Sequence, residues 1–310
     1  MSGDAVCSGV GVLERGVIVG AGSIGERHRT VLIDIGIDIR VVSRRPGVGN
    51  YATVGEAVAN FDPKYVVIAT EAHHHEQALV DLNASNYCGR VLVEKPILAE
   101  PGTVSTDCFE WMGVGYNLRF HPAVDALRRA IGTERVLSAQ ARVGQYLPEW
   151  RPQRDYRTTV TAGPSGGVLL ELSHELDLLN WLIGPTDVRC GAVASTGTLE
   201  IDREDLAIGV LGLPGGGLAS FELNCIDRSP TRSLVITTTE RTAKLDLLTG
   251  RLEVDGATTF SREVSRNETF ASMHRAALDD GQDVCSVNEA LTVVEQVQEL
   301  RHCSVGAGPG

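Results

Sequence analysis

The sequence lacks the marks of several classes of protein. No stretch approaches the ~20 consecutive apolar residues of a membrane span, and the first sixteen residues show no basic segment followed by an apolar one. We therefore expect no membrane partner and no secretory signal. The seven cysteines are scattered without a C-x-x-C pair, which favours a cytoplasmic protein without a zinc site or a disulfide framework. Positive charge is scarce, since the net charge is −12, and this argues against general binding of nucleic acid.

A chain of 310 residues has room for two domains of roughly 100–200 residues each. In its first third, apolar runs alternate with segments of helical periodicity. This alternation predicts an α/β fold with a doubly wound parallel sheet. Strands are expected over residues 17–19, 37–43, 65–70, 90–96 and 112–117, and helices over residues 23–36, 53–61 and 75–85.

Three glycines, Gly20, Gly22 and Gly25, follow the first expected strand with the spacing G-x-G-x-x-G. The first permits a tight turn, the second lets the backbone approach a pyrophosphate, and the third lets helix and strand pack closely. The free amides at the start of the helix, at Ser23 and Ile24, favour an anion there. The motif predicts a dinucleotide site, and the plainer alternative is a strand–helix turn without a ligand.

The end of the second strand bears on which nicotinamide cofactor would bind. An acidic residue there would bind the ribose 2′-hydroxyl of NAD, whereas an arginine would accept the 2′-phosphate of NADP. This strand ends at Ser43, Arg44 and Arg45, while Asp38 lies at its start, away from the ribose. We favour NADP(H) over NAD(H), with solvated loop charges at the two arginines as the alternative.

Four stretches carry a resemblance to a known family: LVEKP (92–96), GYNLRFHP (115–122), GGVLLELSHELDLLNWL (166–182) and SVNEALTVVEQVQEL (286–300). In this order, after the glycine motif, they resemble the Gfo/Idh/MocA oxidoreductases, which act mostly on sugars and cyclitols. The resemblance implies a Rossmann dinucleotide-binding domain over residues 1–120. It also implies a substrate-binding and oligomerisation domain over residues 121–310, built on an open mixed, largely antiparallel sheet.

The chain beyond residue 130 agrees, because strand-like runs follow one another there with few helices between them. The runs LAIGVLGL and LASFEL are too apolar to stay exposed, which predicts a homodimer or homotetramer joined through residues 130–260. Only 20 residues separate Lys95 from Gly115. The family has a longer helix and strand in that interval, so we expect a trimmed edge of the first sheet.

Lys95 is the first candidate catalytic residue. It precedes Pro96 at the end of an expected strand, where doubly wound sheets bind ligands. The resemblance implies that this lysine lies beside the nicotinamide and the reacting oxygen, where an ammonium group stabilises developing negative charge. We place Glu94, Thr70 and His75 near the cofactor too, and the HHH tract at residues 73–75 fits such a contact better than a metal.

A single helix is expected over residues 168–182, with leucines over most of its surface and one polar stripe. The stripe consists of Glu171, His174 and Asp177. Buried charge is costly unless it is paired or used, so the stripe requires a partner or a ligand. The resemblance makes His174 the second catalytic residue, a general acid or base whose pKa near neutrality would suit proton transfer. Asp177 or Glu171 would orient it or bind a substrate hydroxyl. The alternative is a solvent-facing stripe, and we expect no metal because further ligands are lacking.

The loop GQYLPEWRPQRDYR (144–157) concentrates arginine and aromatic side chains. Arginine grips carboxylate or phosphate in pairs, which suits an anionic sugar or a nucleotide-sugar. The alternative is a solvated loop whose arginines pair with Glu149 and Asp155. The candidate substrate-binding residues are Lys95, Asn117, Arg119, Arg151, Tyr156, Glu171, His174 and Asp177, with Arg142, Arg154 and Arg157 as further members of the cationic patch.

The leading hypothesis is an NAD(P)-dependent oxidoreductase that moves a hydride between the cofactor and a hydroxyl or keto carbon of a sugar, nucleotide-sugar or cyclitol. The family also contains glycosidases with a transient redox cycle, so hydrolysis or elimination is a second hypothesis. A third is a non-catalytic regulator that binds the cofactor, against which Lys95 and His174 argue.

Overall fold

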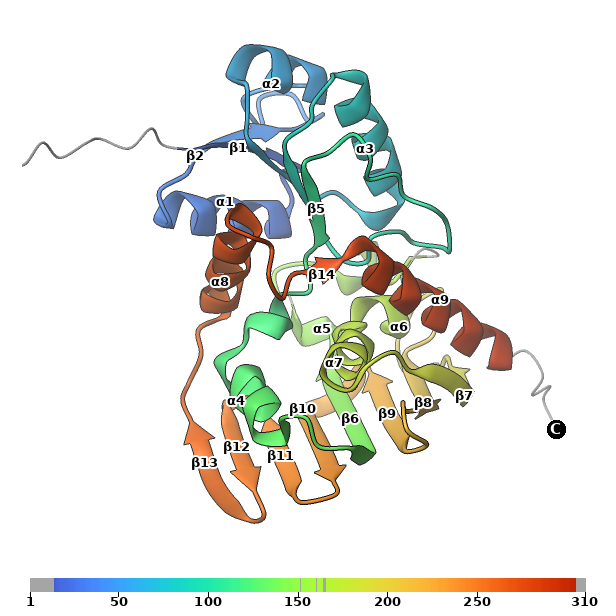
Figure 1. Cartoon of the computed structure of the whole chain (residues 1–310). Coiled ribbons are helices and arrows are strands. Elements are labelled where there is room, and N and C mark those ends of the chain that lie inside the picture. The colour runs from blue at the N-terminus through green and yellow to red at the C-terminus, as the bar shows by residue number, and fades with distance from the viewer. Residues whose placement is uncertain (1–13, 151, 160, 164–165, 305–310) are drawn as a thin grey trace, which may run out of the picture.

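The computed structural model describes residues 14–150, 152–159, 161–163 and 166–304. Two β-sheets with helices packed on them make up the described chain (Figure 1). This arrangement confirms the expected α/β architecture with a second, largely antiparallel sheet.

The first sheet has the strand order β14-β5-β4-β3-β1-β2, and β1 to β5 are all parallel to one another. Its strands are β1 (Arg15–Val19), β2 (Asp38–Val42), β3 (Tyr65–Ile68), β4 (Arg90–Val93), β5 (Trp111–Val114) and β14 (Cys285–Ser286). The connecting helices are α1 (Ser23–Asp34), α2 (Val54–Phe61) and α3 (His75–Ala84), with a short 3-10 turn η1 (Ala72–His74). Strands β1 to β5 and helices α1 to α3 lie where the sequence predicted them, within a few residues.

Local sequence explains these boundaries. Thr53 caps α2 by accepting a hydrogen bond from the Glu56 amide, and the Glu56 carboxylate accepts one from the Thr53 amide in return. Residues 94–110 join β4 to β5 without a helix, so the edge of the sheet is trimmed as expected.

The strands are apolar on both faces because helices cover both faces. Val17, Val66 and Val91 pack in the cluster that contains the α2 and α3 side chains. Their neighbours in sequence, such as Ile18 and Val67, pack against α1 and α8 (Arg266–Leu278). Helix α8 comes from the far end of the chain and lies beside α1 (Figure 1).

The second sheet has the order β13-β12-β11-β10-β6-β9-β8-β7, and every neighbouring pair is antiparallel except β6 and β9. Its strands are β6 (Val136–Tyr146), β7 (Asp187–Ala194), β8 (Leu206–Gly212), β9 (Leu218–Asn224), β10 (Ile226–Thr238), β11 (Thr242–Asp246), β12 (Arg251–Val254) and β13 (Ala257–Ser261).

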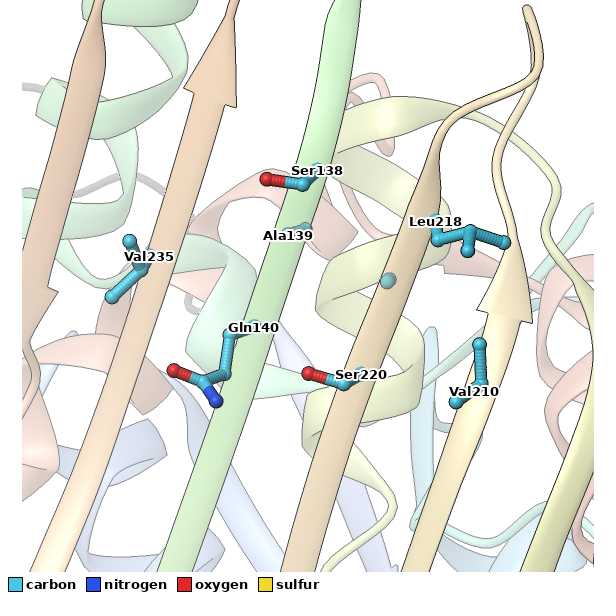
Figure 2. A pocket seen from close by; sticks show the side chains of 8 residues that line it. Ser138, Ala139, Gln140, Val210, Leu218, Ser220 and Val235 are labelled. Carbon is cyan, nitrogen blue, oxygen red and sulfur yellow. The ribbon is translucent and has the colours of Figure 1, made fainter.

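Helices cover one face of this sheet. Helix α4 (Pro122–Ile131) packs on β11 and β12, α7 (His174–Ile183) on β6, and α9 (Val287–Ser304) on β7. The opposite face carries small and apolar side chains from β6, β8, β9 and β10, including Ser138, Ser220 and Val235 (Figure 2). Leu218 and Ile208 are 55% and 49% exposed. We call this surface the open face of the second sheet.

The chain returns to the first sheet at its end. Strand β14 pairs antiparallel with β5, with Cys285 opposite Val114. Residues beyond 265 therefore contribute the helix α8 and the strand β14 to the half of the molecule built on the first sheet, which the sequence had not indicated. The domain boundary at residue 120 stays a prediction.

The prediction of a single helix over residues 168–182 is wrong. The segment forms two helices, α6 (Val168–Glu171) and α7, with Leu172 and Ser173 in a turn between them. Nothing in the leucine pattern marks this break, because both short helices are buried on several sides.

Two findings concern membranes and metals. Among the helices of the described residues, none is long and apolar enough to cross a membrane. Within the same part of the chain, no three His, Cys, Asp or Glu side chains gather in a way that could hold a metal ion.

Candidate active site

Gly20, Gly22 and Gly25 form the turn between β1 and α1, and each meets a different steric demand. Gly20 has a φ of +116°, and a Cβ there would lie 2.6 Å from a backbone carbonyl oxygen just beyond β3. A Cβ at Gly25 would run into the Gly20 carbonyl oxygen. A Cβ at Gly22 would meet no atom within 4 Å, so the turn is open there, where Ser23 and Ile24 begin α1. This cradle fits a pyrophosphate group.

Ser43, Arg44 and Arg45 lie directly after β2 and beside the glycine turn. Arg45 donates a hydrogen bond from its guanidinium to the Ala21 carbonyl, and its amide donates to the Ser43 hydroxyl over 3.2 Å. Arg44 is exposed. Asp38 starts β2 and so lies at the opposite end of this strand from the glycine turn. The structure thus brings the three predicted residues to the glycine turn.

Lys95 lies two residues beyond β4 and reaches the break between α6 and α7. Its ammonium group donates to the carbonyl of Glu171 over 2.5 Å and to that of Leu170 over 3.4 Å. Both carbonyls belong to the end of α6, where the last carbonyls of a helix lack intrahelical partners and attract a cation. This contact holds the catalytic candidate of one sheet against the helices of the other.

His174 begins α7, immediately after that break. Its ring packs edge-to-face on Tyr116, with centroids 5.4 Å apart, and its buried Nδ1 has no hydrogen-bond partner among the described residues. Burial lowers the pKa of His174 well below its usual range. Three nearby cations lower this pKa further, namely Lys95, Arg232 and Arg266. The expectation of a pKa near neutrality is therefore corrected, and the imidazole is neutral at pH 7.

Glu171 and Asp177 do not continue a polar stripe around His174, because the turn at Ser173 interrupts the helix. The Glu171 carboxylate accepts a hydrogen bond from the Thr161 hydroxyl over 3.1 Å. Asp177 faces Arg119 instead, and its role as an orienter of His174 finds no support in this geometry.

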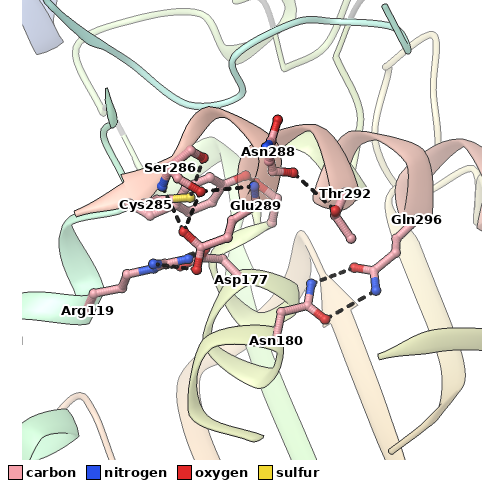
Figure 3. A network of polar contacts seen from close by, with 11 residues as sticks. Arg119, Asp177, Asn180, Cys285, Ser286, Asn288, Glu289, Thr292 and Gln296 are labelled. Atoms are coloured by element: carbon pink, nitrogen blue, oxygen red, sulfur yellow. Dashed lines mark hydrogen bonds and ion pairs between the residues drawn. The ribbon is translucent and has the colours of Figure 1, made fainter. Parts of the chain in front are cut away.

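Arg119 and Asp177 form an ion pair in the protein interior (Figure 3). Arg119 lies in the 3-10 turn η2 (Asn117–Phe120) and donates a second charged contact to Glu289 of α9 over 3.2 Å. Both side chains of the pair are 1% exposed. The two charges therefore pair with each other inside the protein, which corrects the expectation that these residues bind a substrate directly. Asn117 is buried as well, with its amide donating to the Thr269 hydroxyl over 2.7 Å.

Of the remaining predicted cofactor residues, His75 and Glu94 are hydrogen-bonded to their neighbours. His75 is 1% exposed, and its two ring nitrogens lie 3.2 and 3.0 Å from the carbonyl oxygens of Ile97 and Thr70. It holds the loops after β3 and β4 together rather than facing a ligand. Glu94 accepts a hydrogen bond from the Lys95 amide over 3.1 Å. The Thr70 hydroxyl is buried without a partner among the described residues.

The expected cationic patch is not assembled from the described arginines. Arg142 pairs with Glu222 and Asp227 on β9 and β10, and Arg157 pairs with Asp155 and Glu200. The alternative of a loop with internally paired charges therefore holds for Arg157, which pairs with Asp155, whereas Arg142 pairs with strand residues outside the loop. Tyr156 accepts a hydrogen bond at its hydroxyl from the Glu200 amide over 3.2 Å. Arg154 is exposed, and Arg151 lies outside the described residues.

Sequence reasoning missed one contact of Glu94. The other carboxylate oxygen lies 2.8 Å from His28 on α1, which is fully buried. The sequence spacing puts His28 on the same buried face of α1 as Val31 and Leu32. A histidine among apolar positions was the available signal that a polar partner lies across the sheet.

Comparison with known proteins now bears on this geometry. Residues 128–244 match the GFO/IDH/MocA C-terminal domain family. The match lies in the part of the chain that forms the second sheet. This confirms the resemblance carried by the motifs, and no curated protein matches the sequence as a relative.

Solved structures of the Gfo/Idh/MocA type share the whole fold. UDP-N-acetylglucosamine 3-dehydrogenase GnnA from Acidithiobacillus ferrooxidans is 17% identical, with a TM-score of 0.76 over 95% of this chain and 99% of its own. GenD2 from gentamicin A biosynthesis, solved in complex with NAD, is 20% identical, with a TM-score of 0.79 over 94% of both chains. WlbA dehydrogenase from Bordetella pertussis, solved with NADH and UDP-GlcNAcA, is 15% identical, with a TM-score of 0.75 over 96% of both chains.

Proposed function

We propose that the chain is an NAD(P)-dependent oxidoreductase that moves a hydride between a nicotinamide cofactor and a hydroxyl-bearing carbon of a sugar-type substrate. The observation that carries the proposal is the position of Lys95 beside the start of α7. Strands β1, β3 and β4 are parallel neighbours in the sheet, so the glycine turn and Lys95 both lie at the carboxyl ends of these strands. His174 lies near Lys95 at the start of α7, the helix that packs on β6 of the second sheet.

The chain's own residues suit the proton and charge movements of such a reaction. A bound nicotinamide would supply the carbon that accepts or gives the hydride. The Lys95 ammonium stabilises negative charge as it develops on the substrate oxygen. The neutral imidazole of His174 accepts the proton of a substrate hydroxyl, which an imidazolium could not do. This role is supported by Nδ1 of His174, which has no hydrogen-bond partner among the described residues.

We propose NADP(H) as the preferred cofactor. Two features support this preference: Arg44 and Arg45 follow the end of β2, from which an arginine can accept a 2′-phosphate, and no acidic residue ends β2. GenD2 and WlbA were solved with NAD and NADH, so this preference would separate the chain from them.

For the substrate we propose a sugar or cyclitol, with nucleotide-sugars tested first. GnnA is named as a dehydrogenase of UDP-N-acetylglucosamine, and WlbA was solved with UDP-GlcNAcA. Because Arg119, Arg142 and Arg157 are paired within the protein, Arg154 is the described arginine of the loop that suits an anionic group. The six cysteines of the described chain are free thiols, which supports a cytoplasmic location.

The direct test is to follow the absorbance of the reduced nicotinamide with purified full-length chain, NADP or NAD, and a panel of sugars. The panel pairs UDP-sugars and uronic acids with their neutral counterparts and with cyclitols. We expect net cofactor reduction with at least one member. Cleavage of a glycoside without net reduction would indicate the transient redox cycle. Tight cofactor binding with no turnover in either direction would indicate a regulator and contradict the proposal.

A further inference from the structure

A line of four buried side chains runs from the middle of the first sheet to Lys95. The Tyr65 hydroxyl on β3 lies 2.9 Å from Nδ1 of His274 on α8. Nε2 of His274 lies 2.8 Å from Nδ1 of His28 on α1, and Nε2 of His28 lies 2.8 Å from Oε1 of Glu94. Tyr65, His28 and His274 are completely buried, and Glu94 is 7% exposed.

The order of the protons in this line follows from its Lys95 end. The Lys95 amide donates to Oε2 of Glu94, and a carboxylate can accept at both oxygens. His28 then donates from Nε2 to Glu94 and accepts at Nδ1. Its neighbour His274 therefore donates from Nε2 and accepts at Nδ1 from the Tyr65 hydroxyl. Every polar atom of the line is satisfied in this one direction, with both imidazoles neutral and Glu94 ionised.

Burial favours the neutral forms of the two groups farthest from Lys95. Burial lowers the pKa of His274 well below its usual range, and burial raises the pKa of the Tyr65 hydroxyl well above its own. The Phe270 ring packs edge-to-face against His28, with centroids 5.2 Å apart, so an apolar wall flanks the line. Arg90, a cation that opposes this rise in the pKa of Tyr65, donates from Nε to the Ala277 carbonyl over 2.7 Å.

We propose that His28 and His274 are positioning residues, which with Tyr65 hold Glu94 as a carboxylate and thereby fix the backbone at Lys95 relative to α1. The role in the reaction rests on the proposed function. Helix α1 begins at the glycine turn, so the line joins the helix that would bind the cofactor to the strand end that carries the catalytic candidate. Its other anchor, α8, comes from the last fifth of the chain.

The first test uses no substrate and no cofactor. Nitrogen NMR of the histidine-labelled full chain at pH 7 reports which ring nitrogen of each imidazole carries the proton. We expect His28 and His274 to be neutral with the proton on Nε2, with His28→Gln and His274→Gln used to assign the signals. Protonation at both nitrogens of either ring, or the opposite tautomer in either, would overturn the proposal.

Tyr65→Phe removes the terminal donor while keeping the ring, and Tyr87→Phe is its matched control. Tyr87 is also buried in the first domain, and its hydroxyl donates to the Arg90 carbonyl, outside the line. We expect Tyr65→Phe to shift the nitrogen signals of both His274 and His28, and Tyr87→Phe to leave them unchanged. Equal spectra for the two variants would show that the line does not act as a unit.

Kinetics then test the role in the reaction. We expect Tyr65→Phe and His28→Leu to lower kcat by roughly tenfold or more, with KM for the cofactor altered far less, since Tyr65→Phe loses one buried hydrogen bond of the line and His28→Leu loses two. His28→Gln keeps a donor for Glu94 and an acceptor for His274, so it should recover most of kcat. If the wild type turns over substrate and His28→Leu matches it, positioning is refuted while the proposed function stands. If the wild type proves inactive, the NMR result still decides whether the line exists.

Discussion

Arg119 and Asp177 meet inside the protein, with Nη2 of the guanidinium 2.6 Å from Oδ1 and Nε 3.0 Å from Oδ2 of the carboxylate. The pair joins the turn η2 to helix α7. Burial raises the pKa of Asp177, and the guanidinium opposes this shift. Each charge therefore depends on the other, which makes the loss of one partner expensive.

We expect Arg119→Met to lower the free energy of unfolding by about 3–5 kcal/mol, because it leaves the carboxylate of Asp177 buried without its partner. Urea denaturation measures this loss. Arg129→Met is the matched control, since Arg129 forms an exposed pair with Asp125 in α4 and should cost little. Equal losses for the two variants would contradict the structural role of the buried pair.

Stability should fall as the pH is lowered below about 6.5, and His121 should account for part of the loss. Burial lowers the pKa of His121 to about 4, so between these values the unfolded chain binds a proton that the folded chain does not. The cost is up to about 1.4 kcal/mol for each pH unit. Urea denaturation at several pH values between 7 and 4 gives the slope.

His121→Asn separates this titration from helix capping. Nδ1 of His121 accepts a hydrogen bond from the Ala123 amide at the start of α4, and asparagine can accept the same bond without titrating. We expect near wild-type stability at pH 7 and a shallower slope below pH 6.5. His302→Asn, at an exposed histidine of α9, should leave the slope unchanged. An unaltered slope in the His121 variant would show that this imidazole titrates normally.

The cofactor preference can be measured by binding alone. We expect Arg44→Ala to weaken NADP(H) roughly ten- to hundredfold, because one charge-assisted hydrogen bond is lost, and to leave NAD(H) nearly unchanged. Isothermal titration gives both dissociation constants. Arg15→Ala is the control, because Arg15 lies where β1 begins, at the opposite end of that strand from the glycine turn. Tighter binding of NAD(H) by the wild type would refute the NADP assignment.

Assembly through the open face of the second sheet is a further prediction. We expect a dimer or tetramer by light scattering at micromolar concentration, and dissociation on Leu218→Asp. Leu248 has a comparable exposure, 49% against 55% for Leu218, but lies beyond β11 in a turn. Leu248→Asp should therefore leave the mass unchanged. A monomeric wild type would refute assembly through this face.

The catalytic assignment predicts that Lys95→Ala or His174→Ala lowers kcat by roughly 10²–10⁴ while cofactor affinity is nearly preserved. Initial-rate assays give kcat, and cofactor titration gives the dissociation constant of the cofactor. Lys64→Ala removes an exposed lysine of the same domain that pairs with Asp62, and it should have no effect. Near-normal kcat in folded, cofactor-bound Lys95→Ala would eliminate the mechanism.

The first five strands could be predicted from sequence because each is a short apolar run between turn residues, as at Tyr65–Ile68. The glycine turn was equally readable, since its steric demands are local. The pairing of His28 with His274 was not, because the two residues are 246 positions apart. The break at Ser173 was hidden for a related reason. Its free carbonyls are satisfied by Lys95, a contact between distant segments that no local pattern encodes.

The return of the chain through β14 sets an order on biosynthesis. Strand β5 lies at the edge of the first sheet until Cys285–Ser286 has been made, and α8 must arrive before His28 has its partner. The half of the molecule built on the first sheet is therefore completed only after residues 266–286 have left the ribosome. A fragment ending near residue 120 would keep the glycine turn but expose β5 and one face of the sheet, which are surfaces that favour aggregation.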